Sequence, residues 1–142
     1  MTIQLQPLVA PSPAMPVTGR VLHVVEPISF WGGVSPIDGA LSDPRSRHHG
    51  RHVAGSVMVI RELRGSSSGS SVLLELIYRR IAPCAIVLAI PDAILALGVL
   101  VAIEMRWPAP GIFQLARPEQ PFIPEGALLS ISPAGSLSIL EV

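Results

Sequence analysis

The most chemically suggestive part of the sequence is residues 64–71, which read RGSSSGSS and combine one arginine, two glycines and five serines. Apolar residues at helical spacing follow in residues 72–80, so the segment is expected to lead into a helix. A helix start presents unpaired N–H groups and the positive end of the helix dipole, which attract a carboxylate or a phosphate. Gly65 lets the backbone approach a ligand closely, and Arg64 can pair with a carboxylate through two hydrogen bonds. Residues 64–71 therefore predict an anion-binding site.

Two other interpretations fit the same residues. A stretch rich in glycine and serine can be a flexible linker, although linkers seldom run straight into an amphipathic helix. Residues 65–69 also match the nucleophile-elbow pattern G-x-S-x-G, with Ser67 as the nucleophile. That hydrolase fold needs its acid and its histidine after the serine, whereas all four histidines of this chain precede it. The hydrolase interpretation is therefore weak.

The charge balance narrows the possible functions. The formal net charge is zero and only 14% of the residues are charged, whereas binding to nucleic acid needs a basic excess. The sequence holds ten arginines and no lysine. Mechanisms that depend on a lysine, such as Schiff-base chemistry or a P-loop, are therefore excluded.

The single cysteine, Cys84, limits the chain further. One thiol cannot make an internal disulfide, and it cannot hold an iron–sulfur cluster alone, because such clusters need several thiolates. Cys84 begins an apolar run and is expected to be a small core residue. With 142 residues, 49% of them hydrophobic, the chain suits one domain with a substantial core.

The apolar pattern predicts strands and helices around the serine-rich loop. The predicted strands are residues 19–25 (extended by 28–31), 53–60, 84–90, 112–115, 127–131 and 137–140. The predicted helices are residues 72–80 and 92–102, the second capped by Asp92. Residues 1–16 contain four prolines and are expected to form an extended arm or a loose edge, with residues 17–142 as a single domain. This order indicates a mixed β/α domain.

A membrane span is the alternative explanation for residues 81–103, which are apolar except for Asp92. Pro83, Pro91 and Asp92 interrupt this stretch, and a charge at the bilayer centre costs about 3 kcal/mol. A buried strand followed by a buried helix is the better explanation. Residues 1–16 lack the basic and apolar regions of a signal peptide, so the expected location is the cytoplasm.

Residues 45–52, RSRHHGRH, form the only dense charge cluster and are expected to be a surface loop. A metal site at His48, His49 and His52 is the alternative to a solvated loop or a subunit contact. The loop or contact is favoured because no carboxylate or thiolate pattern accompanies the histidines.

Several motifs occur in a fixed order between residues 20 and 102. They are SFWGGV at residues 29–34, Pro36 and Gly39, Asp43, Gly55, RGSSSGS followed by VLLEL, and Ala82-Pro83. In this combination the chain resembles the swivelling domain of the aconitase X family. The resemblance implies an α/β fold of the swivelling β/β/α type, a small barrel-like mixed sheet with flanking helices. The family usually has Asp at the position of Ser35 and His-Pro near residues 46–47, so the chain departs from the pattern there.

The resemblance also implies a function. In this family the domain is fused to a large catalytic domain or made as a separate small subunit, and the length here fits the second arrangement. It implies a hydro-lyase that converts cis-3-hydroxy-L-proline to Δ1-pyrroline-2-carboxylate, active only with a large subunit that holds an iron–sulfur cluster. The alternatives are the small subunit of mevalonate 5-phosphate dehydratase and a non-catalytic partner-binding domain. Neither nucleic acid nor membrane is an expected partner.

The resemblance assigns roles within the loop as well. Ser66, the first serine after the glycine, would be the catalytic base. Arg64, Gly65, Ser67 and Ser68 would contact the hydroxy-acid substrate, with capping of the helix as the other role for the last two. An ordinary serine is a weak base, so it needs oriented N–H donors and a nearby arginine to stabilise its alkoxide. No metal ligand is expected on this chain.

Overall fold

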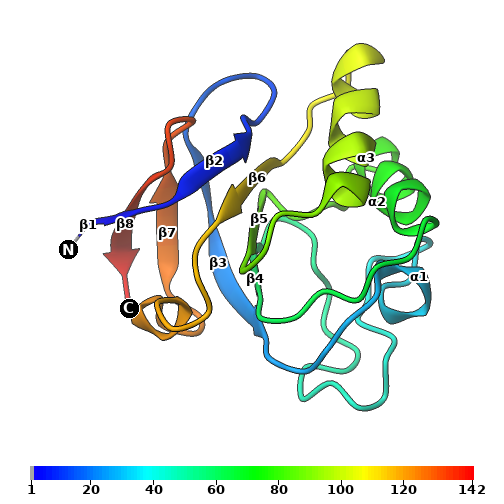
Figure 1. Ribbon diagram of the computed structural model, residues 1–142, viewed down its shortest axis with the longest axis horizontal. Helices are drawn as coiled ribbons and strands as arrows, with labels where there is room; N and C mark the ends of the chain where they lie inside the picture. Colours follow the sequence, from blue (N-terminus) through cyan, green and yellow to red (C-terminus); the bar gives the residue numbers. More distant parts are fainter. Residues whose placement is uncertain (1) are drawn as a thin grey trace.

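Strand pairing organises residues 2–142, which the computed structural model describes, into an eight-stranded mixed sheet with the order β1-β8-β7-β3-β4-β5-β6-β2. The strands are β1 (Thr2–Gln4), β2 (Gln6–Val9), β3 (Val17–Val24), β4 (Val57–Ile60), β5 (Ala85–Leu88), β6 (Gly111–Gln114), β7 (Leu128–Ile131) and β8 (Ser136–Glu141). The helices are α1 (Phe30–Gly33), α2 (Gly69–Tyr78), α3 (Ala93–Glu104) and the 3₁₀ turn η1 (Gln120–Phe122). β3, β4, β5 and β6 run parallel. Figure 1 shows α1, α2 and α3 gathered beside these parallel strands, with β1, β7 and β8 on the other side.

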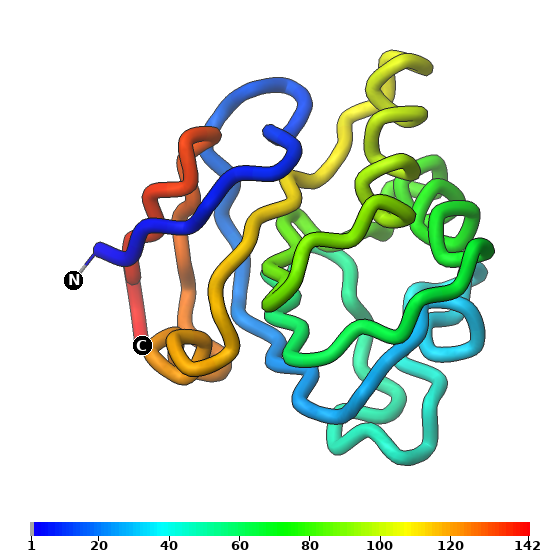
Figure 2. Tube along the Cα trace, in the orientation of Figure 1, coloured from blue at the N-terminus to red at the C-terminus, as the bar shows by residue number. Residues whose placement is uncertain are grey.

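The sheet curls until its two edges meet. β1 and β2 are the opposite edges of the sheet, pairing with β8 and β6 respectively, yet only Leu5 separates them in the chain. Leu5 is fully buried. In Figure 2 the N-terminal trace passes beside the C-terminal strand before it turns towards β6. This curl produces the barrel-like sheet that the resemblance implied. The barrel is not closed by hydrogen bonds, because β1 and β2 do not pair with each other.

The first residues of the chain are therefore part of the fold. The proline content suggested an extended arm or a loose edge for residues 1–16, and residues 2–4 and 6–9 form two hydrogen-bonded edge strands. The division into an arm and a single domain stays a prediction. The backbone N–H of Leu5 also donates to the carbonyl of Gly135 at 2.8 Å. The sequence did not predict these strands clearly, because a proline usually argues against a strand. Pro7 lies in an edge strand, where a residue without an N–H is tolerated.

The parallel strands are buried on both faces, and their side chains divide into two cores. In β4, Val57 and Val59 point into the curl of the sheet, while Met58 and Ile60 pack against the helices. β5 alternates in the same way. Burying one such side chain contributes about 1.5–3 kcal/mol, so both cores favour this register. The strand predicted at residues 84–90 is thus present as the buried β5, but it is shorter, and Ile90 is exposed.

The predicted elements are present, most of them with slightly shifted ends, and three differences are larger. Residues 28–31 do not extend β3: Ile28 makes an isolated bridge to Leu63, and a short helical turn follows. The strand predicted at residues 53–60 begins at Val57, because Gly55 adopts a positive φ of 69° in a preceding turn. The helix that follows β5 is only partly buried, and it exposes Leu97 and Leu100. No helix in residues 2–142 is long and apolar enough to cross a membrane.

Asp92 caps α3 as the sequence predicted. Its backbone is extended, and its side chain accepts a hydrogen bond from the N–H of Leu95 at 2.8 Å. We expect Asp92→Ala to lower the free energy of unfolding by about 1 kcal/mol, because one N–H at the helix start loses its partner. Asp92→Asn keeps an acceptor and should stay close to the parent in urea unfolding. Equal destabilisation by both variants would contradict the capping role.

Candidate active site at the serine loop

The serine-rich segment lies where the parallel strands end. Residues 61–68 connect the carboxyl end of β4 to the start of α2. The beginning of this connection is held against Ile28, whose N–H donates to Glu62 O at 3.1 Å and whose carbonyl accepts from Arg64 N at 2.8 Å. Since ligands of open α/β sheets bind outside the carboxyl ends of the strands, this is a favourable place for a site.

Hydrogen bonds give the loop a defined turn, unlike a flexible linker. The N–H of Gly69 donates to Ser66 O at 2.9 Å, closing the turn that leads into α2. The hydroxyl of Ser70 donates to Ser67 O at 3.3 Å, and that of Ser71 donates to Ser68 O at 2.8 Å. Ser68 holds the N-cap position without a side-chain capping bond. Its hydroxyl is therefore available for another partner.

Ser66 differs from the other serines of the loop. Its Oγ accepts a hydrogen bond from the N–H of Ser68 at 3.3 Å, and its side chain is half-buried, whereas Ser67 is exposed. An N–H that donates to a hydroxyl oxygen stabilises its alkoxide form. Within residues 2–142 the N–H groups of Ser70 and Ser71 have no backbone acceptor, so two more donors stand free in the first turn of α2.

Close contact with α3 holds the first turn of α2 in place. A Cβ added at Gly98 would lie 2.9 Å from the carbonyl oxygen of Ser70 and 3.3 Å from its Cα. Only glycine lets the two helices approach so closely at this point. Asp92 and Ile94, at the start of α3, line a small gap together with Ser66. The serine loop is therefore positioned by both helices.

Little room exists around Ser66 in this chain alone. The gap beside Ser66 has a volume of about 10 Å³, and Ser29, Arg64 and Asp92 also line it. Such a space holds about one water molecule. A wider hollow of about 400 Å³ on the other side of Arg64 is lined by Trp31, Asp43 and Arg45 among others. The gap itself is therefore too small to enclose a substrate.

The arginine of the loop is placed to meet an anion. Arg64 is exposed, and its Nε lies 3.7 Å from Oε2 of Glu62, an ion pair that contributes little at the surface. In the neighbouring hollow, Arg45 donates to both carboxylate oxygens of Asp43, and these bonds lower the pKa of Asp43. The Asp43 carboxylate is thus engaged by Arg45, which leaves Arg64 as the cation adjoining the serines.

The histidines of residues 45–52 do not converge. Nε2 of His48 lies 2.9 Å from Oε1 of Glu125, and Nδ1 of His52 lies 2.9 Å from the carbonyl oxygen of Asp38. Across residues 2–142 no group of three His, Cys, Asp or Glu side chains is arranged to hold a metal ion. Burial raises the pKa of Cys84 to about 11, so its thiol stays protonated. Cys84 packs against the apolar core inside the curl of the sheet.

Comparison with known proteins identifies the family. The profile of the aconitase X swivel domain matches residues 10–139. The chain belongs to the aconitase X family. Among solved structures, aconitase X from Thermococcus kodakaraensis in its holo-form superposes with a TM-score of 0.84 and 25% identity over 99% of both chains. This confirms the swivelling fold, the N-terminal strands included.

Two relatives of this aconitase X chain carry enzyme names. Over 91 residues it is 50% identical to cis-3-hydroxy-L-proline dehydratase of Pseudomonas aeruginosa, which covers 62% of this chain and 15% of that enzyme. It is 32% identical over 127 residues to the phosphomevalonate dehydratase small subunit of Methanopyrus kandleri, covering 87% of this chain and 88% of that subunit. The chain thus spans a small part of the Pseudomonas enzyme and almost all of the archaeal small subunit.

Proposed function

We propose that this chain is the small subunit of a heteromeric aconitase X dehydratase that removes water from cis-3-hydroxy-L-proline. The observation that supports this best is the position of Ser66. Its hydroxyl accepts an N–H at the carboxyl edge of the sheet, yet the space beside it is only about 10 Å³. A base without room for its substrate fits a subunit whose active site is completed by a partner.

The chemistry assigned to Ser66 is removal of a proton from C2 of the substrate, the carbon that bears the carboxylate. The hydroxyl group leaves C3 and the electron pair of the C2–H bond forms the C2–C3 double bond. The proton and the hydroxyl group together make one water. The resulting enamine tautomerises to Δ1-pyrroline-2-carboxylate. The N–H of Ser68 and the positive end of α2 stabilise the Ser66 alkoxide that accepts the proton.

The rest of the loop would hold the substrate carboxylate. Arg64 provides a planar guanidinium beside Ser66, and Gly65 adds no side chain that would obstruct the approach. Ser67 and Ser68 have hydroxyls free to orient the substrate. Fixing the substrate in this way brings C2 to the base and removes much of the entropic cost of the reaction.

The family implies an iron–sulfur cluster, and the residues of this chain do not fit it. Cys84 is the one thiol, burial raises its pKa to about 11, and residues 2–142 offer no three-ligand group. We therefore assign the cluster to the large subunit. A cytoplasmic complex of the two subunits is the corresponding proposal for partner and location.

The phosphomevalonate dehydratase small subunit is the second candidate. Its support is the end-to-end match with the Methanopyrus subunit, which covers 87% of this chain. The hydroxyproline assignment is favoured by the higher identity, 50% over 91 residues, to the Pseudomonas enzyme. A reaction with mevalonate 5-phosphate would need a subsite for the phosphate group, and the partner would contribute residues to that subsite.

A direct comparison of the two substrates tests the proposal. We expect the chain, co-purified with the large aconitase X subunit of the same organism, to dehydrate cis-3-hydroxy-L-proline. Mass spectrometry should show the loss of one water, and mevalonate 5-phosphate should remain unchanged. The reverse preference would establish the second candidate. A stable complex that dehydrates neither substrate would identify a non-catalytic binding domain.

A further inference from the structure

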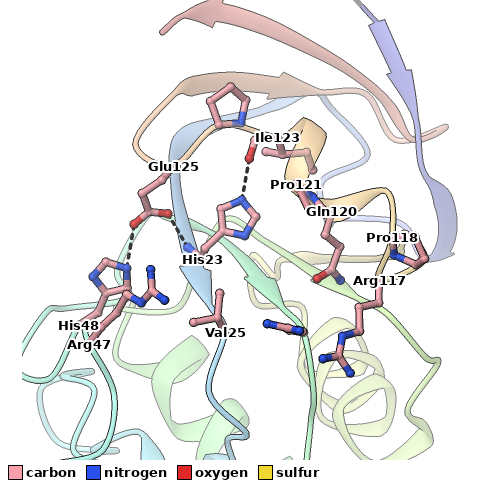
Figure 3. A pocket seen from close by; sticks show the side chains of 12 residues that line it. His23, Val25, Arg47, His48, Arg117, Pro118, Gln120, Pro121, Ile123 and Glu125 are labelled. Carbon is pink, nitrogen blue, oxygen red and sulfur yellow. Dashed lines mark hydrogen bonds and ion pairs between the residues drawn. The ribbon is translucent and has the colours of Figure 1, made fainter.

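A larger hollow lies near the carboxyl ends of β3 and β4 and was not apparent from the sequence. It has a volume of about 660 Å³ and is lined by His23, Arg47, His48, Arg61, Arg117 and Gln120 among others. Figure 3 shows that the labelled side chains come from the end of β3, from the loop of residues 45–52 and from the segment around η1. We call this hollow the arginine groove.

A buried glutamine builds one wall of the arginine groove. Gln120 is 3% exposed, and its Nε2 donates to Ile60 O at 3.0 Å and to Leu115 O at 3.2 Å. These bonds tie η1 to the ends of β4 and β6. Arg61 directly follows β4, and Arg117 lies between β6 and η1. The two arginines are therefore carried by backbone that the fold holds in place.

Arg61 and Arg117 differ from the cations around them. Arg47 lies 3.5 Å from Glu26, and His48 lies 2.9 Å from Glu125. Within residues 2–142 neither Arg61 nor Arg117 forms an ion pair. Both guanidinium groups stay charged at any physiological pH, and both line the same groove. The groove therefore offers two permanent positive charges to an anionic partner.

The remaining surface of the groove suits a polypeptide. Val25 and Ile123 give it apolar contacts, and Pro118, Pro121 and Pro124 form a rigid wall without N–H groups. Apolar contacts flanked by guanidinium groups match a segment that carries both apolar and acidic side chains.

Neighbouring hollows share lining residues between the arginine groove and the serine loop. Arg61 and Arg117 also line a hollow of about 370 Å³ that reaches Leu63 and Asp92. Asp92 in turn lines the gap at Ser66. A partner that encloses a substrate at Ser66 therefore extends over this face towards Arg61. We propose that the arginine groove docks an acidic segment of the large subunit; this inference rests on the proposed function.

Charge reversal tests the docking. The double variant Arg61→Glu with Arg117→Glu should weaken binding to the large subunit by at least about 100-fold, because both charges would then repel the acidic segment. The matched control, Arg80→Glu with Arg106→Glu, makes the same charge change at the far ends of α2 and α3 and should bind within about threefold of the parent. Urea unfolding of both variants shows that each is folded.

Binding is measured by titrating the large subunit with each small subunit at rising salt concentrations. We expect the parent affinity to fall with salt and the affinity of the groove variant to fall less. Equal affinity of parent and groove variant would overturn the docking inference while leaving the dehydratase intact. Unchanged affinity with a raised KM would show that the arginines bind the substrate anion instead. If the parent chain did not bind the large subunit, the proposed function itself would fail.

Discussion

Ser66→Ala is expected to lower the dehydratase activity of the assembled complex by about 10²–10⁴-fold, the usual effect of removing a general base. The substitution removes the Oγ that accepts the N–H of Ser68 and leaves the backbone turn from Ser66 O to Gly69 N in place. Subunit assembly and the absorbance of the iron–sulfur cluster should therefore not change. Activity is measured under saturating cis-3-hydroxy-L-proline, with assembly checked by size-exclusion chromatography.

The neighbouring residues of the loop supply matched controls. Ser67→Ala and Ser68→Ala remove hydroxyls that make no hydrogen bond to Ser66, so each should cost less activity than Ser66→Ala. Arg64→Lys keeps the charge but loses the planar fork, and should raise KM more than it lowers kcat. An inactive Ser67→Ala beside a nearly normal Ser66→Ala would move the base one residue along. Full activity of all three serine variants would mean that the partner provides the base.

The isolated chain is expected to be colourless and inactive, and to acquire iron absorbance and dehydratase activity only with the large subunit. One protonated thiol does not hold a cluster, and the space of about 10 Å³ at Ser66 does not enclose a hydroxy acid. Each subunit alone should be inactive, and only the mixture should be active. It is measured by assaying each subunit alone and then mixing them in a titration.

Activity of the isolated small subunit on any hydroxy acid would contradict this expectation. Activity of the large subunit alone would contradict it as well, because the base is assigned to this chain. A mixture of the large subunit with the Ser66→Ala small subunit separates binding of the cluster from catalysis. That mixture should show the absorbance of the cluster with little turnover.

Local patterns in the sequence were enough to predict most of the individual elements. The apolar run of residues 84–90 contains the buried strand β5, and Asp92 caps the helix that follows. These features depend on neighbours a few residues away, so spacing and capping chemistry reveal them. The family was also recognisable, because its motifs occur as short segments in a fixed order. The role of Ser66 stays a prediction.

The assembly of these elements depended on contacts between distant residues. Only the folded chain shows that the edges of the sheet meet at Leu5, or that Gly98 lets α3 approach Ser70. The local periodicity of the sequence does not predict either contact, because strand pairing and helix crossing join segments that are far apart in the chain.

The sequence by itself determined the serine loop, the two helices beside it and the lack of ligands for a cluster. Only the tertiary structure placed Arg61 and Arg117 on one groove, since one follows β4 and the other follows β6. It also showed that the gap lined by Ser66 has a volume of only about 10 Å³. Composition and spacing report what each segment is made of. Which segments become neighbours is decided by the burial of two apolar cores on the faces of one curled sheet.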